Sequence, residues 1–383
     1  MQHPEIIKMP SAPIATANCC RDSQQRFALI SVDGGEVTHF LQKNSYSAAE
    51  AFVAGKFDVQ GDVIAAVRFF MNRKHSTMRS LWCSIAARLA RASMTLPGKS
   101  RAQRNIQFHY DRSNEFYAQF LDARMQYSAA DFSDRGRSLE EAQTQKLERI
   151  CLALRLRPGE RMLDVGCGWG GLVVYAAERF GVEAVGCTLS QSQFDFATAL
   201  VRRRGLERQV RIELKDYREI EGRFAKIASV GMFEHVGRNR LPEYFEHVRL
   251  VLEDHGLFLN RGIVRPEGVS DGPETLFLQR NVFPGGELVH LSEVIRKAEM
   301  AGFEVYELED LRIHYALTCK AWVRRLQSNA KRCRTLVGER AYRTWLLYLA
   351  ASCVSFEDGV TDDVQILCRK SPRRATVPCN CAD

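Results

Sequence analysis

The feature that most constrains the fold of this 383-residue chain is a glycine-rich stretch that runs from Met162 to Gly181. It reads MLDVGCGWGGLVVYAAERFG, so an apolar run leads into clustered glycines and an alanine-rich run follows them. Glycine loses more backbone freedom on folding than any other residue, so such a cluster marks a tight turn or a close approach to the backbone. Gly166, Gly168 and Gly171 have the spacing GxGxxG between a strand pattern and a helix pattern, where backbone amides can approach a polar cofactor.

Strand and helix patterns alternate along this part of the chain. The predicted strands are RMLDVG, EAVGCTL, VRIELKD, KIASVGM, GLFLNRGIV and FEVYELEDL, and the predicted helices are GLVVYAAERF, SQSQFDFATALVRRRG and Leu291 to Ala301. This alternation is typical of a parallel sheet that is covered by helices on both faces. The sequence therefore predicts an α/β fold.

The first hundred residues follow a different pattern. Short strands are predicted at RFALISV and VTHFLQ, helical spacing runs from Ser47 to Phe70, and the pair Pro97-Gly98 is the best candidate for a boundary. We predict four parts: a flexible N-terminus at 1–25, an accessory domain at 26–98, a main domain at 99–370 and a flexible tail at 371–383.

Basic residues are concentrated around that boundary. The formal net charge is +8, and the segment from Met71 to Asn105 contains eight Lys or Arg and no Asp or Glu. Its apolar residues recur near helical spacing, which favours an amphipathic helix on an anionic membrane surface. A helix that packs on the core, followed by a solvated basic linker, explains the same pattern equally well. No nucleic-acid-binding motif accompanies the charge, so we expect no nucleic acid partner.

Composition excludes several other classes of protein. No apolar run reaches about 18 residues, so we expect no membrane span, and the start of the chain lacks the pattern of a secretion signal. The twelve cysteines form no CxxC pair. We therefore expect reduced cysteines, no metal site and a cytoplasmic location.

The strands after the glycine turn distinguish two cofactors. A dinucleotide site needs an acidic residue about 20 positions on, but the second strand ends Cys187-Thr188-Leu189-Ser190-Gln191 without a carboxylate. The third strand ends with Asp216 and Tyr217, which are suited to accept from an adenine amino group and to cover the ring. This pattern favours S-adenosylmethionine over NAD.

Longer motifs make the pattern specific. In order and spacing, the chain resembles the cyclopropane-fatty-acyl-phospholipid synthase family of methyltransferases from about Asn105 to Lys370. The matching motifs are FHYDRSNEFYAQFLDARMQYS, LDVGCGWGGL, GCTLSQSQ, KDYRE, SVGMFEHVG, NVFPGGEL and HYALTCKAW. The resemblance implies a Rossmann-like seven-stranded methyltransferase sheet with a smaller N-terminal α+β accessory domain, to which AFVAGKFDVQGDV is more faintly similar.

The resemblance also implies which residues bind S-adenosylmethionine. They come from the segment before the first strand and from the ends of the first three strands. The expected set is Tyr127, Ser128, Gly166, Cys167, Gly168, Gly170, Thr188, Leu189, Ser190, Gln193, Asp216, Tyr217 and Arg218.

In this family the sulfonium methyl goes to a cis double bond in an acyl chain through a carbocation-like species, and a bound bicarbonate removes the proton. The expected catalytic residues are Glu234, Tyr315, Arg261 and His235. Carboxylates and aromatic faces are suited to stabilise a developing cation. Glu234 and Tyr315 match bicarbonate-binding positions of the family, and Ile263 matches the contributor of a backbone group.

Three positions depart from the family pattern. Ala129 and Ser352 stand where the family has cysteines, and Arg261 stands where it has a histidine. Arginine holds anions well, so bicarbonate, a substrate carboxylate and a phosphate all remain alternatives. A salt bridge from Arg261 to Glu234 would argue against an anion site.

We predict methyl transfer to the cis double bond of an unsaturated acyl chain in membrane phospholipid, giving a cyclopropane or a methyl-branched chain. The expected partner is an anionic phospholipid surface at the inner membrane face. A homodimer is one alternative for the oligomeric state. One alternative is a small-molecule N- or C-methyltransferase, in which His235 is the base and Glu234 orients it. Another is a catalytically silent lipid-binding relative. Trp169 is expected to serve packing.

Overall fold

The computed structural model describes residues 6–8, 27–31, 45–72, 113–269, 273–282 and 287–371. Contacts divide the chain into two compact units, each built from separated parts of the sequence. The smaller unit comprises Met1–Leu96, Ser270–Gly285 and Cys319–Asp358, and the larger comprises Pro97–Val269, Gly286–Thr318 and Gly359–Asp383. Within the described ranges, no helix is both long and apolar enough to cross a membrane.

Several sequence predictions fall outside the described residues. These are the flexible N-terminus apart from residues 6–8, which form a short strand, the strand at VTHFLQ, the boundary at Pro97-Gly98, nearly all of the tail from 371, and the basic segment after Asn72. They stay predictions.

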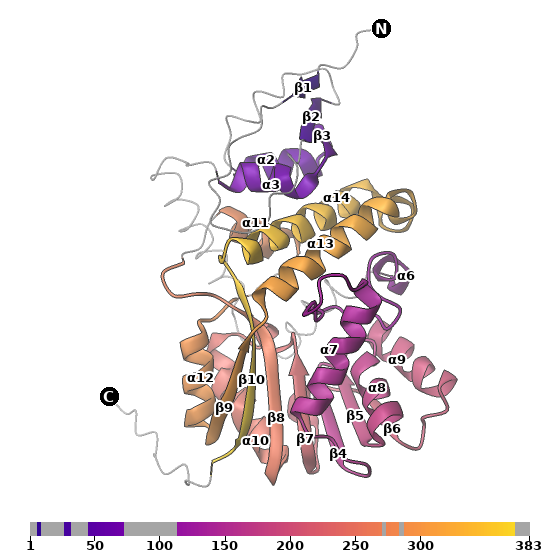
Figure 1. Ribbon diagram of the computed structural model, residues 1–383, viewed down its shortest axis with the longest axis vertical. Helices are drawn as coiled ribbons and strands as arrows, with labels where there is room; N and C mark the ends of the chain where they lie inside the picture. The colour runs from indigo at the N-terminus through magenta and orange to yellow at the C-terminus, as the bar shows by residue number, and fades with distance from the viewer. Residues whose placement is uncertain are drawn as a thin grey trace. The chain divides into compact units, whose positions relative to one another are not determined.

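The larger unit is built on a seven-stranded sheet with the order β6-β5-β4-β7-β8-β10-β9 (Figure 1). Its strands are β4 (Arg161–Val165), β5 (Glu183–Thr188), β6 (Val210–Leu214), β7 (Phe224–Val230), β8 (Leu252–Val264), β9 (Phe303–Asp310) and β10 (Asp362–Lys370). Neighbours from β6 to β8 pair in parallel, whereas β10 is antiparallel to both β8 and β9. The predicted seven-stranded sheet is confirmed, and the inserted strand β10 makes it mixed rather than fully parallel.

Helices cover both faces of this sheet, and the alternation of side chains along the strands explains how. The helices of the larger unit are α6 (Asn114–Tyr117), α7 (Leu139–Ala153), α8 (Gly171–Phe180), α9 (Gln191–Arg203), α10 (Leu241–Val251) and α12 (Leu291–Met300). Met162 on β4 packs in the apolar core beneath α7 and α8, and the next residue, Leu163, packs in the core beneath α10 and α12.

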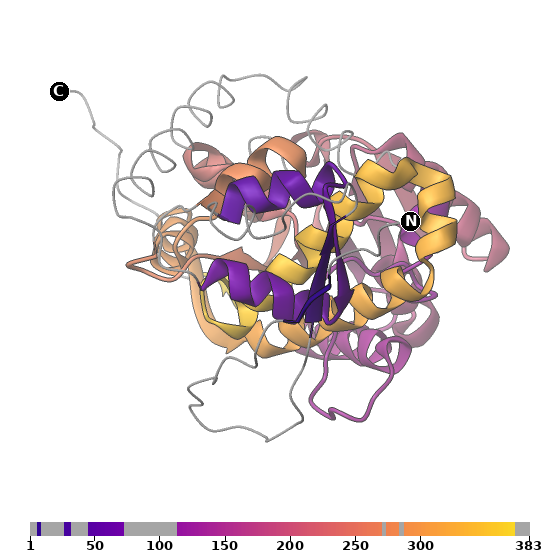
Figure 2. The same cartoon turned by 90° about the horizontal axis from the view of Figure 1, so that it is seen from above.

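The smaller unit has its own sheet and helices. The antiparallel strands β1 (Ile6–Lys8), β2 (Phe27–Ser31) and β3 (Phe57–Gly61) form the sheet. Its helices are α2 (Ser45–Val53), α3 (Val63–Met71), α11 (Pro273–Asn281) and α14 (Ala330–Glu357), while α13 (Arg312–Ser328) runs from the larger unit into the smaller one. Figure 2 shows the indigo helices α2 and α3 on either side of the yellow helix α14, which contacts both.

The helix pattern from Ser47 to Phe70 is wrong as a single helix, because β3 interrupts it. Gly55 and Gly61 adopt φ values of 75° and 95°, which a helix does not allow. Asp62 then starts α3, since its carboxylate accepts hydrogen bonds from the next helical amides at 2.9 and 3.1 Å.

Arg343 joins α14 to the N-terminal segment inside the smaller unit. Its guanidinium is buried and donates to the backbone oxygens of Phe52 at 3.2 Å and Phe57 at 3.0 Å. It also forms an ion pair with Asp58 at 2.6 Å. Residues almost 300 positions apart are therefore held together by one buried cation.

Candidate active site

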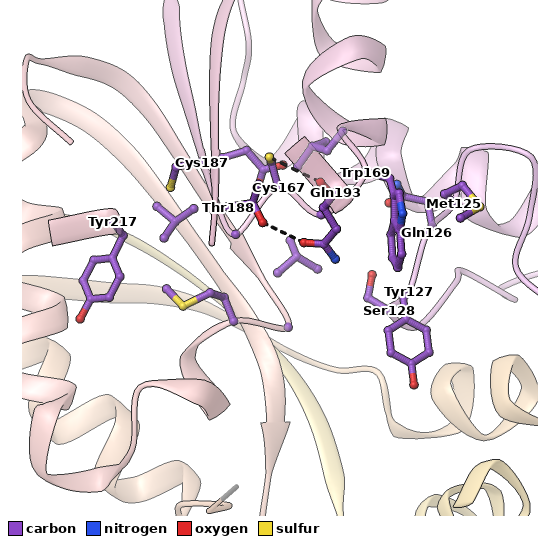
Figure 3. Close-up of a pocket in the computed structure, with 18 of the residues that line it drawn as sticks. Met125, Gln126, Tyr127, Ser128, Cys167, Trp169, Cys187, Thr188, Gln193 and Tyr217 are labelled. Atoms are coloured by element: carbon purple, nitrogen blue, oxygen red, sulfur yellow. Dashed lines mark hydrogen bonds between the residues drawn. The ribbon is translucent and has the colours of Figure 1, made fainter. Parts of the chain in front are cut away.

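A pocket lies at the carboxyl ends of β4 and β5, where open α/β sheets bind their ligands (Figure 3). Figure 3 shows Tyr217 at one end of this pocket and Tyr127, Ser128 and Trp169 at the other. The glycine turn after β4 forms part of the wall, which includes Gly166, Cys167 and Gly168.

The glycine turn presents bare backbone to the pocket. Gly166 and Gly168 have φ values of 80° and 55°, in the region that side-chain-bearing residues rarely adopt. A Cβ on Gly166 would lie 2.7 Å from Met232 Cγ, so this position also has no room for a side chain. A Cβ on Gly168 would have Gln193 Nε2 as its nearest non-neighbouring atom, at 4.0 Å, so a ligand has room to approach the main chain here. A glycine turn of this kind fits a polar cofactor that touches the main chain.

The ends of β5 and β6 supply the next part of the wall. Thr188 Oγ1 and Gln193 Oε1 are hydrogen bonded at 2.8 Å, and both residues line the pocket (Figure 3). Tyr217 contacts Tyr244 edge to face, with ring centroids 5.5 Å apart. This pair holds an aromatic ring at the far end of the pocket, where a base can stack.

Four of the predicted cofactor residues are absent from the described pocket wall: Gly170, Ser190, Asp216 and Arg218. Gly170 faces α9, because a Cβ there would lie 3.0 Å from Ala197 Cβ. Ser190 caps α9. The Asp216 carboxylate accepts two hydrogen bonds from the Arg218 guanidinium at 2.8 and 2.6 Å, so it is engaged by a neighbour rather than open to an adenine.

A buried lysine, which was not predicted from the sequence, holds the Tyr127-Ser128 segment in place. Lys146 Nζ donates to Gln126 Oε1 at 2.6 Å and to Ser128 Oγ at 3.0 Å. Lys146 and Asp164 both line the pocket and are almost fully buried. Burial lowers the pKa of Lys146 to about 7 and raises the pKa of Asp164 to about 7.

Trp169, which was predicted to serve packing, also forms a specific hydrogen bond. Its Nε1 donates to Asn114 Oδ1 at 2.8 Å, and Ser192 Oγ donates to the same oxygen at 2.9 Å. The indole ring contacts Tyr117 at a centroid distance of 4.9 Å and lines the pocket. The short helix α6 is thereby tied to the glycine turn and to the start of α9.

Glu234 lies in a 3₁₀ turn after β7 and is not itself part of the described pocket wall, whereas Met232 and His235 on the two sides of it are. Its Oε1 accepts a hydrogen bond from the Ile263 amide at 2.7 Å. Its Oε2 is buried and has no hydrogen-bond partner among the residues that the structure describes. Burial, with a smaller contribution from Asp363, raises the pKa of Glu234 to about 7.

The other predicted catalytic residues are placed differently. His235 lines the pocket, and burial lowers its pKa to about 4, so its imidazole is neutral at pH 7. Tyr315 lies in the first turn of α13, is half-buried and is not part of the described pocket wall.

Arg261 forms a buried ion pair, but its partner is Asp363 rather than Glu234. Its Nε and Nη2 donate to Asp363 Oδ2 at 3.1 and 3.0 Å, and both side chains are 3% exposed. Nη2 also donates to the Ala129 carbonyl at 2.9 Å. Asp363 was not predicted from the sequence, because β10 begins with two aspartates and ends with Arg369 and Lys370, so one acidic residue in it gives no local signal for a buried ion pair.

These contacts show whether hydrogen-bond donors at this position are available to a bicarbonate ion. The Ile263 amide is engaged by Glu234, and Arg261 directs two of its nitrogens at Asp363 and the Ala129 carbonyl. A bicarbonate here would lie beside two carboxylates, with these donors already engaged. The residues therefore do not fit a bound bicarbonate.

The sheet, the bare glycine turn and the pocket at its edge define an S-adenosylmethionine-dependent methyltransferase. The chain matches the family model described as mycolic acid cyclopropane synthetase over residues 98–366. It belongs to this family.

Known relatives are similar over most of the chain. A probable fatty acid methyltransferase from Pseudomonas putida is 36% identical over 354 residues, which cover 88% of this chain and 84% of that protein. Sphingolipid C9-methyltransferase 2 from Gibberella zeae is 32% identical, and the match covers 83% of this chain but 63% of the fungal one. The crystal structure of the mycolic acid cyclopropane synthase CmaA1 with SAH and CTAB has a TM-score of 0.68 and 32% identity, covering 72% and 99% of the two chains.

Proposed function

We propose that this protein transfers the methyl group of S-adenosylmethionine to the cis double bond of an unsaturated acyl chain in membrane phospholipid, giving a cyclopropane or a methyl-branched chain. The observation that carries the proposal is the Glu234 carboxylate, held by the Ile263 amide at one oxygen and unpaired within the described residues at the other. An alkene is a weak nucleophile, so its reaction with a methyl donor needs a site that stabilises positive charge. The names of the relatives in Pseudomonas and Gibberella agree with a lipid substrate.

Each part of the site has a role in this reaction. When bound, S-adenosylmethionine supplies an electrophilic methyl group. Gly168 offers main-chain groups to the donor, and Thr188 with Gln193 shapes the middle of its pocket. Glu234 and the adjacent buried ring of Phe233 stabilise positive charge on the acyl chain. The buried surroundings exclude water that would otherwise trap a cation.

The test is a fatty acid methyl ester profile of a bacterial host rich in unsaturated phospholipid. Expression of the chain should convert part of the unsaturated acyl chains into products heavier by one carbon, either cyclopropane or branched. The Gly168→Val variant serves as the negative control, because its side chain occupies the space through which the donor approaches the main chain of the turn. An unchanged profile with folded, donor-binding protein would contradict the proposal.

We also propose that the basic segment from Met71 to Asn105 docks on anionic phospholipid. Eight basic residues without an acidic one give a strong, salt-sensitive attraction to such a surface. Cosedimentation with phosphatidylglycerol vesicles should decrease as salt rises from about 0.05 to about 0.5 M, and neutral vesicles should bind much less. Equal binding to both kinds of vesicle would contradict this part of the proposal.

A soluble amine is the second candidate substrate, because neutral His235 lines the pocket and has the protonation state of a base. The two candidates differ in one measurement. A lipid enzyme should show no turnover on small amines in the absence of vesicles or detergent, whereas an N-methyltransferase should turn over without any lipid.

A further inference from the structure

We infer that this chain completes methyl transfer without bound bicarbonate, and that Glu234 Oε2 itself takes the proton which the acyl chain releases. The inference rests on the proposed function, since it concerns the last step of that reaction. It depends on three features of the described residues. Among these residues, Arg261 is paired with Asp363, Glu234 Oε2 is buried without a hydrogen bond, and Gly262 leaves room for the Glu234 carboxylate.

The ion pair closes the position that an anion would need. Arg261 and Asp363 lie on neighbouring strands β8 and β10, and each is 3% exposed. An arginine whose charge is balanced by a buried carboxylate at 3.0 Å gains little from a second anion, which would also have to lose its water. Arg261 instead holds the Ala129 carbonyl at 2.9 Å, next to the pocket-lining Ser128. It is therefore a positioning residue and not an anion ligand.

The open oxygen provides an acceptor for a proton. The Ile263 amide donates to Oε1 at 2.7 Å, so this oxygen is engaged and Oε2 is the one left to accept a proton. Oε2 is buried without a partner within the described ranges, and a buried acceptor of this kind is costly unless a ligand or a reaction uses it. Gly262 makes the arrangement feasible, because a Cβ there would lie 2.6 Å from Glu234 Oε1 and 2.5 Å from Phe233 Cε1.

Atoms and electrons balance in this reaction with the alkene, the methyl donor and Glu234, and no further reactant is needed. The π pair of the alkene forms the new bond to the methyl carbon, and the carbon–sulfur pair of the donor stays on sulfur. The positive charge then lies on the other alkene carbon. A neighbouring C–H bond gives its electron pair to close a ring or to form a new double bond, and its proton goes to Oε2. The carboxylate becomes a carboxylic acid, which returns the proton to water after product release.

The groups around Glu234 set the pH at which it can act. Burial, and to a smaller extent Asp363 on β10, raises the pKa of Glu234, whereas Arg261 on β8 is directed at Asp363. Tyr244 on α10 and His235 on the same turn are both neutral at pH 7, because burial raises the pKa of the tyrosine well above its usual value and lowers that of the histidine. Turnover should therefore rise with pH through about 7, as Glu234 loses its proton.

The first experiment measures turnover on unsaturated phospholipid vesicles in carbon dioxide-depleted buffer, with and without added bicarbonate. The expected kcat is the same within about twofold, and Glu234→Gln should lower it at least about 100-fold while the donor still binds. Glu253→Gln, an exposed glutamate at the start of β8, is the matched control. Stimulation of the wild type by bicarbonate, or wild-type turnover in Glu234→Gln, would overturn the inference.

Two further measurements do not depend on turnover, so they separate this inference from a failure of the proposed function. Infrared difference spectra should show carboxylic acid absorption that titrates near pH 7 from both Asp164 and Glu234, and Glu234→Gln should remove the part that belongs to Glu234. Titration with ¹³C-labelled bicarbonate, followed by NMR, should show no saturable binding to the wild type but binding to Asp363→Ala, which leaves Arg261 without its carboxylate. Saturable binding to the wild type, or none to folded Asp363→Ala, would contradict the inference.

Discussion

Gly262 determines how closely the Glu234 carboxylate can approach β8. The smallest side chain at this position would overlap both Glu234 and Phe233. Gly262→Ala should therefore displace the carboxylate and lower kcat by about 100-fold, with little change in the dissociation constant of the methyl donor. Steady-state kinetics and calorimetry on the same samples measure the two effects. Gly136→Ala, in a loop without a strained φ, is the control and should change neither value.

The raised pKa of Glu234 also has a consequence for stability. Between its ordinary value of 4.5 and about 7, the native state holds a proton that the unfolded state has lost, so stability falls as pH rises through this window. Glutamine does not titrate. From about pH 5 to about pH 8, the free energy of unfolding of Glu234→Gln relative to wild type should increase by on the order of 2 kcal/mol. Urea denaturation at both pH values checks this, and a pH-independent difference would contradict it.

The sequence predicted those site residues whose signal is local. Gly166 and Gly168 stand in one short motif, and Thr188 follows directly from the end of the next strand. Arg261 and Asp363 are 102 residues apart, so their pairing depends on how the sheet is ordered. Local spacing carries no information about that order, and for this reason Glu234 was considered as the partner of Arg261.

At the scale of elements, α6 illustrates how a short helix depends on tertiary contacts. Four residues are too few to be stable alone, and Asn114 Oδ1 accepts hydrogen bonds from Trp169 Nε1 and Ser192 Oγ. Asn114→Ala should loosen the helix and weaken binding of S-adenosylmethionine by about tenfold, measured by calorimetry. Gln119→Ala, just beyond the same helix, removes an exposed bond to the Glu115 carbonyl and should leave the affinity unchanged. Equal affinities in both variants would refute this role of Asn114.

Six of the seven strands of the larger unit and the helices α8, α9 and α12 were predicted, since their apolar periods and terminal glycines are clear, whereas α6, α7 and α10 were not. The segment from Ser47 to Phe70 was predicted incorrectly, because its apolar spacing suits a helix and the pairing of β3 with β2 is a tertiary effect. The strand β10 was not located at all. It follows a 28-residue helix instead of the usual short alternation, and its antiparallel direction departs from the pattern of the preceding strands.

At the scale of the whole molecule, the smaller unit is assembled from three separated parts of the chain. α14 packs against α2 and α3, and Arg343 binds backbone oxygens next to them. Deletion of residues 1–72 should therefore expose an apolar helix face and a buried cation. The free energy of unfolding should fall by about 2 kcal/mol for each large apolar side chain that becomes exposed. Lower melting temperature and binding of a hydrophobic dye are the expected results. Deletion of 372–383, outside the described elements, is the control, and a monodisperse, equally stable 1–72 deletion would contradict the expectation.

The antiparallel strand β10 is made after β9 but lies between β8 and β9 in the sheet. During synthesis, the glycine turn and Glu234 leave the ribosome well before Asp363 does. Until β10 inserts, Arg261 lacks its counter-charge and the sheet has a gap beside β8. The seven-stranded sheet is therefore complete only when β10 has been translated, and a chain that ends before Asp363 leaves the buried Arg261 without this carboxylate.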